Sequence, residues 1–425
     1  MRLSSAIRAL PASLSRHLPR RLLTLAAVGA LVACGGGGGN KVTLLDAFQV
    51  LGQVNYTNDV ANATSSNQAG SPTASTLSGP FGGVSVSSSG STLFVADTAN
   101  YRVLGYSPIP NSNGGASTFV LGQANLTSRV STNPPTQGTL SQPSSVSISS
   151  DGSKLVVADT GNNRVLIWNS VPTATGTPPD VVVGQADFTT SDYSGTPTAS
   201  NLRAPKAAII VGSKLLVADT GNNRVLVWNT VPTSNGAAAD YVLGQTSLSS
   251  QFSPVTTNYT SAGLYTPSAL WSDGTQLLVA DTGNNRVLYW SVFPTATATP
   301  ADFVVGQTDF NRNSSGTAAT LLKSPSGVTS DGSSFYVADT GNNRVLKFGS
   351  MPIASGQAAT FVYGQGETKF TAATANDSDQ NGTSDDNPSQ DTLSGPTGVY
   401  ISADTAGKTL YVTDRQNHRV LLFTP

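Results

Sequence analysis

The sequence predicts an all-β protein, a six-bladed β-propeller of four-stranded antiparallel blades, and three observations support this prediction. One ten-residue string recurs six times, which at roughly sixty residues per copy is typical of a repeat architecture. Charged residues make up only 11% of the chain and Glu367 is the single glutamate, which disfavours exposed helix. Glycine and proline, with 42 and 24 residues, supply many turns. The copies of the string begin at Val95, Val157, Val217, Val279, Val337 and Val412.

Each repeat contains four short apolar runs, most clearly in the second repeat. The expected strands span residues 145–149, 154–159, 164–168 and 180–185. The short segments between them, such as Asp151-Gly152, have the composition of hairpin turns. Apolar residues at successive positions of the third strand indicate that both faces of each sheet are buried. Six such sheets are therefore expected to stack face to face around a ring.

The two ends of the propeller are expected to meet in one blade. The sixth repeat ends at Pro425, directly after its third strand, and lacks the Val-x-Gly-Gln strand that ends the other repeats. Residues 48–53 read Phe-Gln-Val-Leu-Gly-Gln. This N-terminal segment is therefore predicted to pair as the outer strand of the last blade, because closure removes exposed sheet edges.

The N-terminal segment has the features of a targeting signal. Five arginines precede an apolar run at residues 22–33, which is too short to span a bilayer and has the length of a signal-peptide core. The run ends in Leu31-Val-Ala-Cys34, which resembles a bacterial lipobox. Residues 1–33 are therefore predicted to be a lipoprotein signal peptide, and Cys34 is predicted to carry the lipid.

The lipid is expected to anchor the rest of the chain to a membrane. Residues 34–45 are predicted to be a flexible glycine-rich tether, and residues 46–425 the propeller. Gly35, rather than aspartate, follows Cys34. By its similarity to sorted lipoproteins this favours the outer membrane over the inner membrane of a bacterial cell envelope, on the periplasmic or surface side.

Residue counts exclude several classes of protein. The single cysteine, Cys34, forms no intrachain disulfide. His17 and His418 are the only histidines, which excludes a metal site built from three imidazoles of one chain. After removal of the signal peptide, 18 basic residues stand against 24 acidic ones, a balance unlike that of a nucleic-acid-binding protein. We therefore expect no nucleic-acid partner, and we expect a monomer.

The segment Asn417-His418-Arg419-Val420, which follows Tyr411–Asp414, resembles the signature of the NHL repeat family. The resemblance covers residues 46–425, and it implies a six-bladed propeller. Some members of the family bind proteins or RNA, and a related group are lyases that use histidine-bound metal. The lyase residues are absent here, so the resemblance implies no particular activity. The central blades have asparagine in place of the histidine, at Asn163, Asn223, Asn285 and Asn343.

An aspartate and an arginine flank the turn between the second and third strands of every repeat. Carboxylate and guanidinium form charge-assisted hydrogen bonds, so this recurrence predicts a structural role, with a catalytic carboxylate as the alternative. The pairs are Asp97/Arg102, Asp159/Arg164, Asp219/Arg224, Asp281/Arg286, Asp339/Arg344 and Asp414/Arg419.

Three smaller features recur with the same period. Gly161 and its equivalents are expected to supply the positive φ of the turn. An aromatic residue four positions after each arginine, such as Trp168, is expected to pack between blades, with a ligand-stacking platform as the alternative. The Gly-Gln pairs, such as Gly184-Gln185, are expected to form hydrogen bonds at strand ends.

The connections between blades are the most variable segments, and they are expected to share one face with the turns at residues 160–163 and their equivalents. We call this end of the propeller the long-loop face. Variable loops on a rigid scaffold are the usual place for binding. A protein, peptide or carbohydrate partner is therefore expected there.

The longest connection contains an acidic run that resembles a calcium loop. Asp377, Asp379 and Asn381 place oxygen atoms at alternate positions, and Asp385 follows. Pro388 stands where an EF-hand has its bidentate glutamate. The run is interpreted as a shorter calcium loop or as a solvated acidic linker. Calcium is the one cofactor considered, and none is required.

Three functions are compatible with these features. The leading hypothesis is a membrane-anchored extracytoplasmic propeller that acts as a binding or interaction scaffold for an unknown ligand. The alternative is an extracytoplasmic hydrolase or lyase with a metal or carboxylate site in the central channel, for which Asp192 and Asp309 are non-repeated acids. No catalytic residue is assigned, because candidate bases are few. The third is a structural protein of the cell envelope.

Overall fold

The structure is a computed structural model that describes residues 46–425, apart from residues 65–66, 194, 252–258, 366–368, 380 and 405–406. The chain divides into two units, Met1–Val42 and Thr43–Pro425, and all described residues belong to the second unit. The expected signal peptide 1–33, the lipidation site Cys34 and the tether 34–45 therefore lie outside the described residues.

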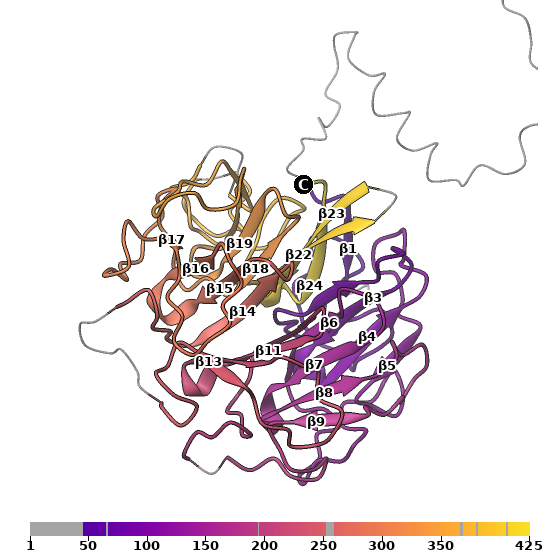
Figure 1. Cartoon of the computed structure of the whole chain (residues 1–425). Coiled ribbons are helices and arrows are strands. Elements are labelled where there is room, and N and C mark those ends of the chain that lie inside the picture. Colours follow the sequence, from indigo (N-terminus) through magenta and orange to yellow (C-terminus); the bar gives the residue numbers. More distant parts are fainter. Residues whose placement is uncertain are drawn as a thin grey trace, which may run out of the picture. The chain divides into compact units, whose positions relative to one another are not determined.

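The described residues form six four-stranded antiparallel sheets, which confirms the predicted propeller (Figure 1). The inner strands are β2 (Val84–Val86), β6 (Pro143–Ile148), β10 (Ala207–Val211), β14 (Pro267–Ser272), β18 (Gly327–Ser330) and β22 (Pro396–Asp404). The second strands are β3 (Leu93–Asp97), β7 (Leu155–Asp159), β11 (Lys214–Asp219), β15 (Leu277–Asp281), β19 (Phe335–Asp339) and β23 (Gly407–Asp414). Each inner strand contacts the inner strands of the two neighbouring blades, so the ring is closed.

The third and outer strands complete the blades, numbered 1 to 6 from β2. The third strands are β4 (Arg102–Tyr106), β8 (Arg164–Trp168), β12 (Arg224–Trp228), β16 (Arg286–Trp290), β20 (Arg344–Phe348) and β24 (Arg419–Phe423). The outer strands are β5 (Phe119–Leu121), β9 (Val181–Val183), β13 (Tyr241–Leu243), β17 (Phe303–Val305), β21 (Phe361–Tyr363) and β1 (Gln49–Leu51). Between the second and third strands lie the 3₁₀ turns η1 (Thr98–Asn100), η2 (Thr160–Asn162), η3 (Thr220–Asn222), η4 (Thr282–Asn284), η5 (Thr340–Asn342) and η6 (Arg415–Asn417).

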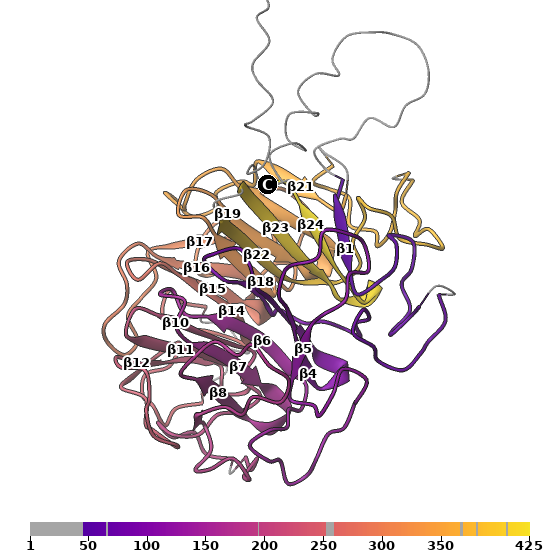
Figure 2. The same ribbon diagram turned by 90° about the vertical axis from the view of Figure 1, so that its right-hand side faces the viewer.

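Ring closure occurs in blade 6, as predicted. Strand β1, from the N-terminal end of the propeller, pairs antiparallel with β24, and Val50 lies opposite Leu421. Both views show β1, drawn in indigo, beside the yellow β24 (Figures 1 and 2). The pairing covers the outer edge of β24, which would otherwise present unpaired backbone groups to another chain.

The hydrophobic core lies between the blades. One cluster joins Phe94 and Ala96 of blade 1 to Val146, Leu155 and Trp168 of blade 2, and five similar clusters complete the ring. Because each sheet packs on a neighbour through both faces, its strands are apolar at successive positions, as the sequence predicted. The recurring aromatic residues are buried in this core, which confirms their packing role.

The turn between the second and third strands differs from the sequence prediction in one respect. The positive φ belongs to Asn163, at 52°, and not to Gly161. Gly161 is needed for a different reason, since a Cβ there would lie 2.5 Å from Oγ of Ser141 and 2.7 Å from its carbonyl oxygen. The glycine therefore makes room for the connection that enters the blade, while asparagine, which tolerates this conformation, occupies the left-handed position.

The Gly-Gln pairs close the outer strands, as expected. Gly184 has a φ of 90°, and a Cβ on it would lie 2.5 Å from Cδ1 of Leu202. The amide of Gln185 donates to the carbonyl oxygens of Asn163 at 3.1 Å and Asp192 at 2.9 Å. The pair thus joins the outer strand, the 3₁₀ turn and the following connection.

The six Asp/Arg pairs are ion pairs with fully buried side chains, and their structural role stays a prediction. In blade 3, Nε of Arg224 lies 2.6 Å from Oδ2 of Asp219, and burial raises the pKa of that carboxyl although the guanidinium opposes the shift. The other guanidinium nitrogens donate to carbonyl oxygens of the connections before and after the blade, including those of Thr198 and Leu248. Each pair therefore anchors two inter-blade connections.

We expect Arg224→Met to destabilise the propeller by about 3–5 kcal/mol, because it leaves the buried carboxylate of Asp219 without its counter-charge. Denaturant unfolding of the purified propeller measures this loss. Arg312 pairs with Asp309 at 2.9 Å on the surface, so Arg312→Met serves as the control and should change stability by no more than about 0.5 kcal/mol. Equal losses in the two variants would contradict the structural role of the buried pair.

Candidate functional site

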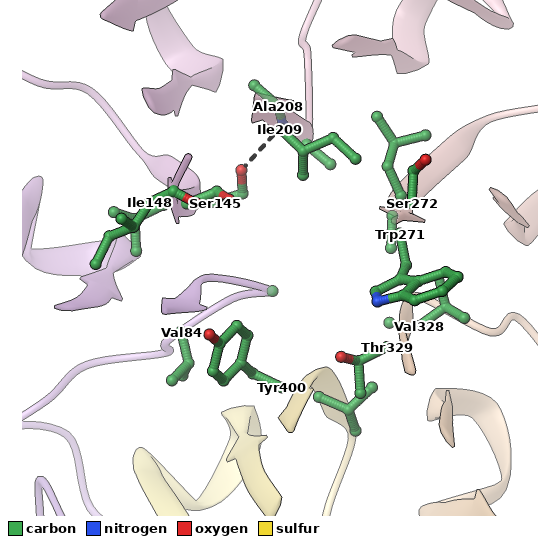
Figure 3. A pocket seen from close by; sticks show the side chains of 18 of the residues that line it. Val84, Ser145, Ile148, Ala208, Ile209, Trp271, Ser272, Val328, Thr329 and Tyr400 are labelled. Atoms are coloured by element: carbon green, nitrogen blue, oxygen red, sulfur yellow. Dashed lines mark hydrogen bonds between the residues drawn. The ribbon is translucent and has the colours of Figure 1, made fainter. Parts of the chain in front are cut away.

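The centre of the ring contains a cavity of about 370 Å³. The cavity is lined by residues that lie in, or directly beside, the inner strands of all six blades. Figure 3 shows the side chains of many of them around the open centre. Cavities of this size hold small organic ligands in other proteins. The cavity, called the channel below, is therefore the candidate site.

The wall of the channel combines apolar side chains with hydroxyl groups. Ile148, Ile209, Trp271 and Val328 project from four different blades (Figure 3). The half-buried indole of Trp271 supplies the largest flat surface in the wall. Such a wall favours a ligand with an apolar or flat part.

Hydroxyl groups satisfy several backbone groups at the inner edges of the sheets. Oγ of Ser145 accepts a hydrogen bond from the N–H of Ala208 at 3.2 Å, across the boundary between two blades. The hydroxyl of Tyr400 donates to the carbonyl oxygen of Val86 at 3.1 Å, across another boundary. An inner strand has no further strand to pair with, so these bonds replace part of a sheet ladder. The wall is rich in hydrogen-bonding groups as a result.

The described residues that line the channel include no aspartate, glutamate, histidine or cysteine. Their titratable side chains are those of Lys206 and Tyr400. Across the described parts of residues 46–425, no group of three or more histidine, cysteine, aspartate or glutamate side chains is placed to hold a metal ion. The described wall thus offers groups for binding and few for acid–base chemistry.

One end of the channel, which Lys206 lines, lies on the side of the long-loop face. Thr160, the first residue of η2, donates to the carbonyl oxygen of Pro205 at 2.7 Å, directly before Lys206. The amide of Asn163 donates to the carbonyl oxygen of Ser191 in the following connection at 3.1 Å. The turns, the connections and Lys206 therefore share one end of the propeller, as the sequence predicted for the first two.

The recurring pairs lie between strands of each blade and do not line the channel. His418 is also a scaffold residue: it occupies the left-handed position after η6, with a φ of 53°, and its Nδ1 accepts a hydrogen bond from the N–H of Gly79 at 2.7 Å. Oδ1 of Asn163 accepts from Ala204 in the same way at 2.8 Å. Burial lowers the pKa of the His418 imidazole below its ordinary value of 6.5.

The acidic loop brings its predicted residues together through hydrogen bonds. The carboxylate of Asp377 accepts from the backbone N–H groups of Asn381 at 3.0 Å and Gly382 at 2.9 Å. The Asn381 amide donates to Asp379 at 2.9 Å, and the Asp385 carboxylate accepts from the N–H of Ser378 at 2.8 Å. The calcium site at these positions stays a prediction.

Trp271, Tyr400 and Lys206 were not predicted as site residues. The sequence was interpreted through positions that recur in the six repeats, whereas the channel takes its chemistry from positions that differ between them. The sequence does mark Trp271 as unusual, since it occupies the strand position that Ser147 holds in the second repeat. Comparison of non-identical positions in the inner strands would have selected it.

No protein-family model matches this chain, and no curated protein matches it. Three solved structures illustrate the structural similarities. A Kuenenia stuttgartiensis hydrazine synthase chain has 14% identity and a TM-score of 0.44, and the match covers 82% of this chain and 96% of that one. A chain of a nidogen/laminin complex has 13% identity and a TM-score of 0.40, with 74% and 91% covered.

The third is an auxiliary nutrient binding protein from Bacteroides ovatus, with 14% identity and a TM-score of 0.48 over 84% of this chain and 71% of that one. All three TM-scores are below 0.5, too low for these proteins to inform the function of this chain. Separately, none of the described residues of the propeller belongs to a helix long and apolar enough to cross a membrane.

His418→Asn is expected to keep the fold, because asparagine fills the same role in four blades, and to reduce the loss of stability in acid. A lowered pKa means that the unfolded state binds more protons below about pH 6.5, so His418 costs up to about 1.4 kcal/mol per pH unit from there down to its folded pKa. Melting temperatures of parent and variant between pH 7.5 and 5.5 test this. Parallel curves would show that His418 stays equally protonated in both states.

Proposed function

We propose that this protein is a membrane-anchored extracytoplasmic binding protein whose ligand enters the central channel from the long-loop face. The observation that carries the proposal is the channel itself, a cavity of about 370 Å³ with a wall of apolar and hydroxyl-bearing residues. A rigid ring with a lined opening suits binding because the site needs little reorganisation when the ligand arrives.

The composition of the channel supports binding over catalysis. A hydrolase or lyase in the channel needs a nucleophile, a general base or a metal ion that protein side chains hold in place. The described lining residues provide the Lys206 amine and the Tyr400 phenol, and the phenol already donates to Val86. Asp309, one of the non-repeated acids, pairs with Arg312 on the surface.

The partner is proposed to be a protein, a peptide or a carbohydrate. Its bulk would rest on the inter-blade connections of the long-loop face, and one end of it would enter the channel. The buried Asp/Arg pairs support this arrangement, because they hold the connections in fixed positions around the opening.

The membrane anchor rests on the lipobox-like segment that ends at Cys34. Several acyl chains on an N-terminal cysteine would hold the propeller at a membrane surface, and Gly35 favours the outer membrane. The NHL-type resemblance fits such a protein, since the propeller serves as a scaffold there.

Cys34→Ser should abolish incorporation of radiolabelled palmitate and move the protein out of the membrane fraction. Palmitate labelling and fractionation of cells that express the full chain measure both effects. Ser4→Ala, which also lies in the signal peptide, is the control and should leave labelling unchanged. Equal labelling of the parent and Cys34→Ser would contradict lipidation at this residue.

Ser147→Phe should block the channel, because Ser147 is a half-buried lining residue and the phenyl ring would extend into the cavity. Monosaccharides, disaccharides and short peptides that raise the melting temperature of the parent are expected to bind this variant about tenfold more weakly or worse. Ser170→Phe, at an exposed position after β8, is the matched control. Compounds that stabilise all three proteins equally would place binding outside the channel.

A further inference from the structure

The hydrogen bonds between blades on the long-loop face follow a strict pattern in five of the six blades. The first residue of the 3₁₀ turn is a threonine whose hydroxyl donates to a proline carbonyl of the next blade, as Thr220 does to Pro267 at 2.6 Å. The same bond is formed by Thr98, Thr160, Thr282 and Thr340. In blade 6 the corresponding residue is Arg415, so this bond is missing there.

A second pattern concerns the residue after that proline, at the end of the channel on the side of the long-loop face. In four blades it bears a hydroxyl that bonds to the next blade, as Ser268 does to the carbonyl oxygen of Ser326 at 3.3 Å. Ser144, Ser326 and Thr397 form equivalent bonds. Blade 3 has Lys206 at this position, and blade 1 has Phe81 followed by one extra residue.

The three departures meet at one place. Nζ of Lys206 lies 5.1 Å from the centroid of the Phe81 ring, and the Arg415 guanidinium carbon lies 5.4 Å from it. Lys206 belongs to blade 3 and Phe81 to blade 1, so the lysine reaches past blade 2. Lys206 and Arg415 therefore both lie against the ring of Phe81, and all three residues lack the scaffold bond of their repeat position. Of the three, Lys206 lines the channel.

The two cations lack a counter-charge among the described residues. Neither Lys206 nor Arg415 forms an ion pair there. Burial and the guanidinium of Arg415 lower the pKa of the Lys206 amino group, so a bound anion would stabilise its charged form. Lys206 is half-buried and Arg415 is exposed, and two like charges placed together raise the local positive potential.

We infer that Phe81, Lys206 and Arg415 form an anion-binding site at the channel opening, and that the ligand carries a carboxylate or a phosphate. This inference rests on the proposed function, because it names the charged group of the ligand that enters the channel. The anion contacts the two cations, and the uncharged part continues along the wall between Trp271 and the hydroxyl groups. Phe81 holds both cations through their attraction to its ring.

The repeat itself supplies variants that remove the site without harming the scaffold. Lys206→Ser introduces the residue of blades 2, 4 and 5, and Arg415→Thr introduces the residue of blades 1 to 5. Lys323→Ser removes an exposed lysine that precedes Pro325 on the same face, and it is the matched charge control. Circular dichroism and melting without ligand establish that all variants fold.

The first measurement is the melting temperature in increasing inorganic phosphate, at constant ionic strength set with sodium chloride. Phosphate should raise the melting temperature of the parent and of Lys323→Ser. The double variant, which carries both Lys206→Ser and Arg415→Thr, should need at least about tenfold more phosphate for the same rise in melting temperature. Absence of stabilisation in the parent, or an equal response of the double variant, would overturn the inference.

The second measurement uses glucuronate, glucose 6-phosphate and glucose, which share a sugar body and differ in the charged group. A preference of the parent for one of the two anions over glucose identifies carboxylate or phosphate, and it should disappear in the double variant. If the parent binds glucuronate, glucose 6-phosphate and glucose equally well and Ser147→Phe abolishes this binding, the inference fails while the channel remains the binding site. If neutral compounds bind all variants equally, the proposed function fails as well.

Discussion

The buried aspartate–arginine pair is the interaction on which the rest of this propeller depends. An uncompensated charge in a protein interior costs several kcal/mol, so both partners must be fully hydrogen-bonded. In blade 3 the Asp219 carboxylate accepts from Arg224, from the Asn222 amide and from the N–H of Arg203, and the guanidinium donates onward to loop carbonyls. Because those carbonyls belong to two inter-blade connections, satisfying one ion pair also positions the loops around the channel opening.

The closed ring separates the residues that stabilise the fold from those available for function. Core side chains such as Leu216 and Leu288 lie between sheets, where both faces are covered. The inner strands alone face an open space, and they need hydroxyl groups such as those of Ser145 and Tyr400 to satisfy backbone groups. The inner strands therefore tolerate sequence differences that the second and third strands do not.

The sixth 3₁₀ turn departs from the other five at two residues, and only one of the two replacements keeps the hydrogen bond of its repeat position. His418 replaces an asparagine and keeps its hydrogen bond to the following connection, so the scaffold is unchanged. Arg415 replaces a threonine and loses its bond, while its charge is directed to the Phe81 ring. A replacement that preserves the contact is structural, and one that abandons it is a candidate for function. The same distinction separates Lys206 from Ser144.

The sequence by itself determined the six blades, their strands and the closure by β1. All of these depend on local patterns repeated in phase, and the strand of residues 180–185 was placed within two residues of β9. The turn was partly misjudged, because the need for Gly161 arises from Ser141 in a separate connection. The tertiary structure alone decided that Phe81, Lys206 and Arg415 meet, since only ring closure brings blades 1, 3 and 6 together at one end of the channel.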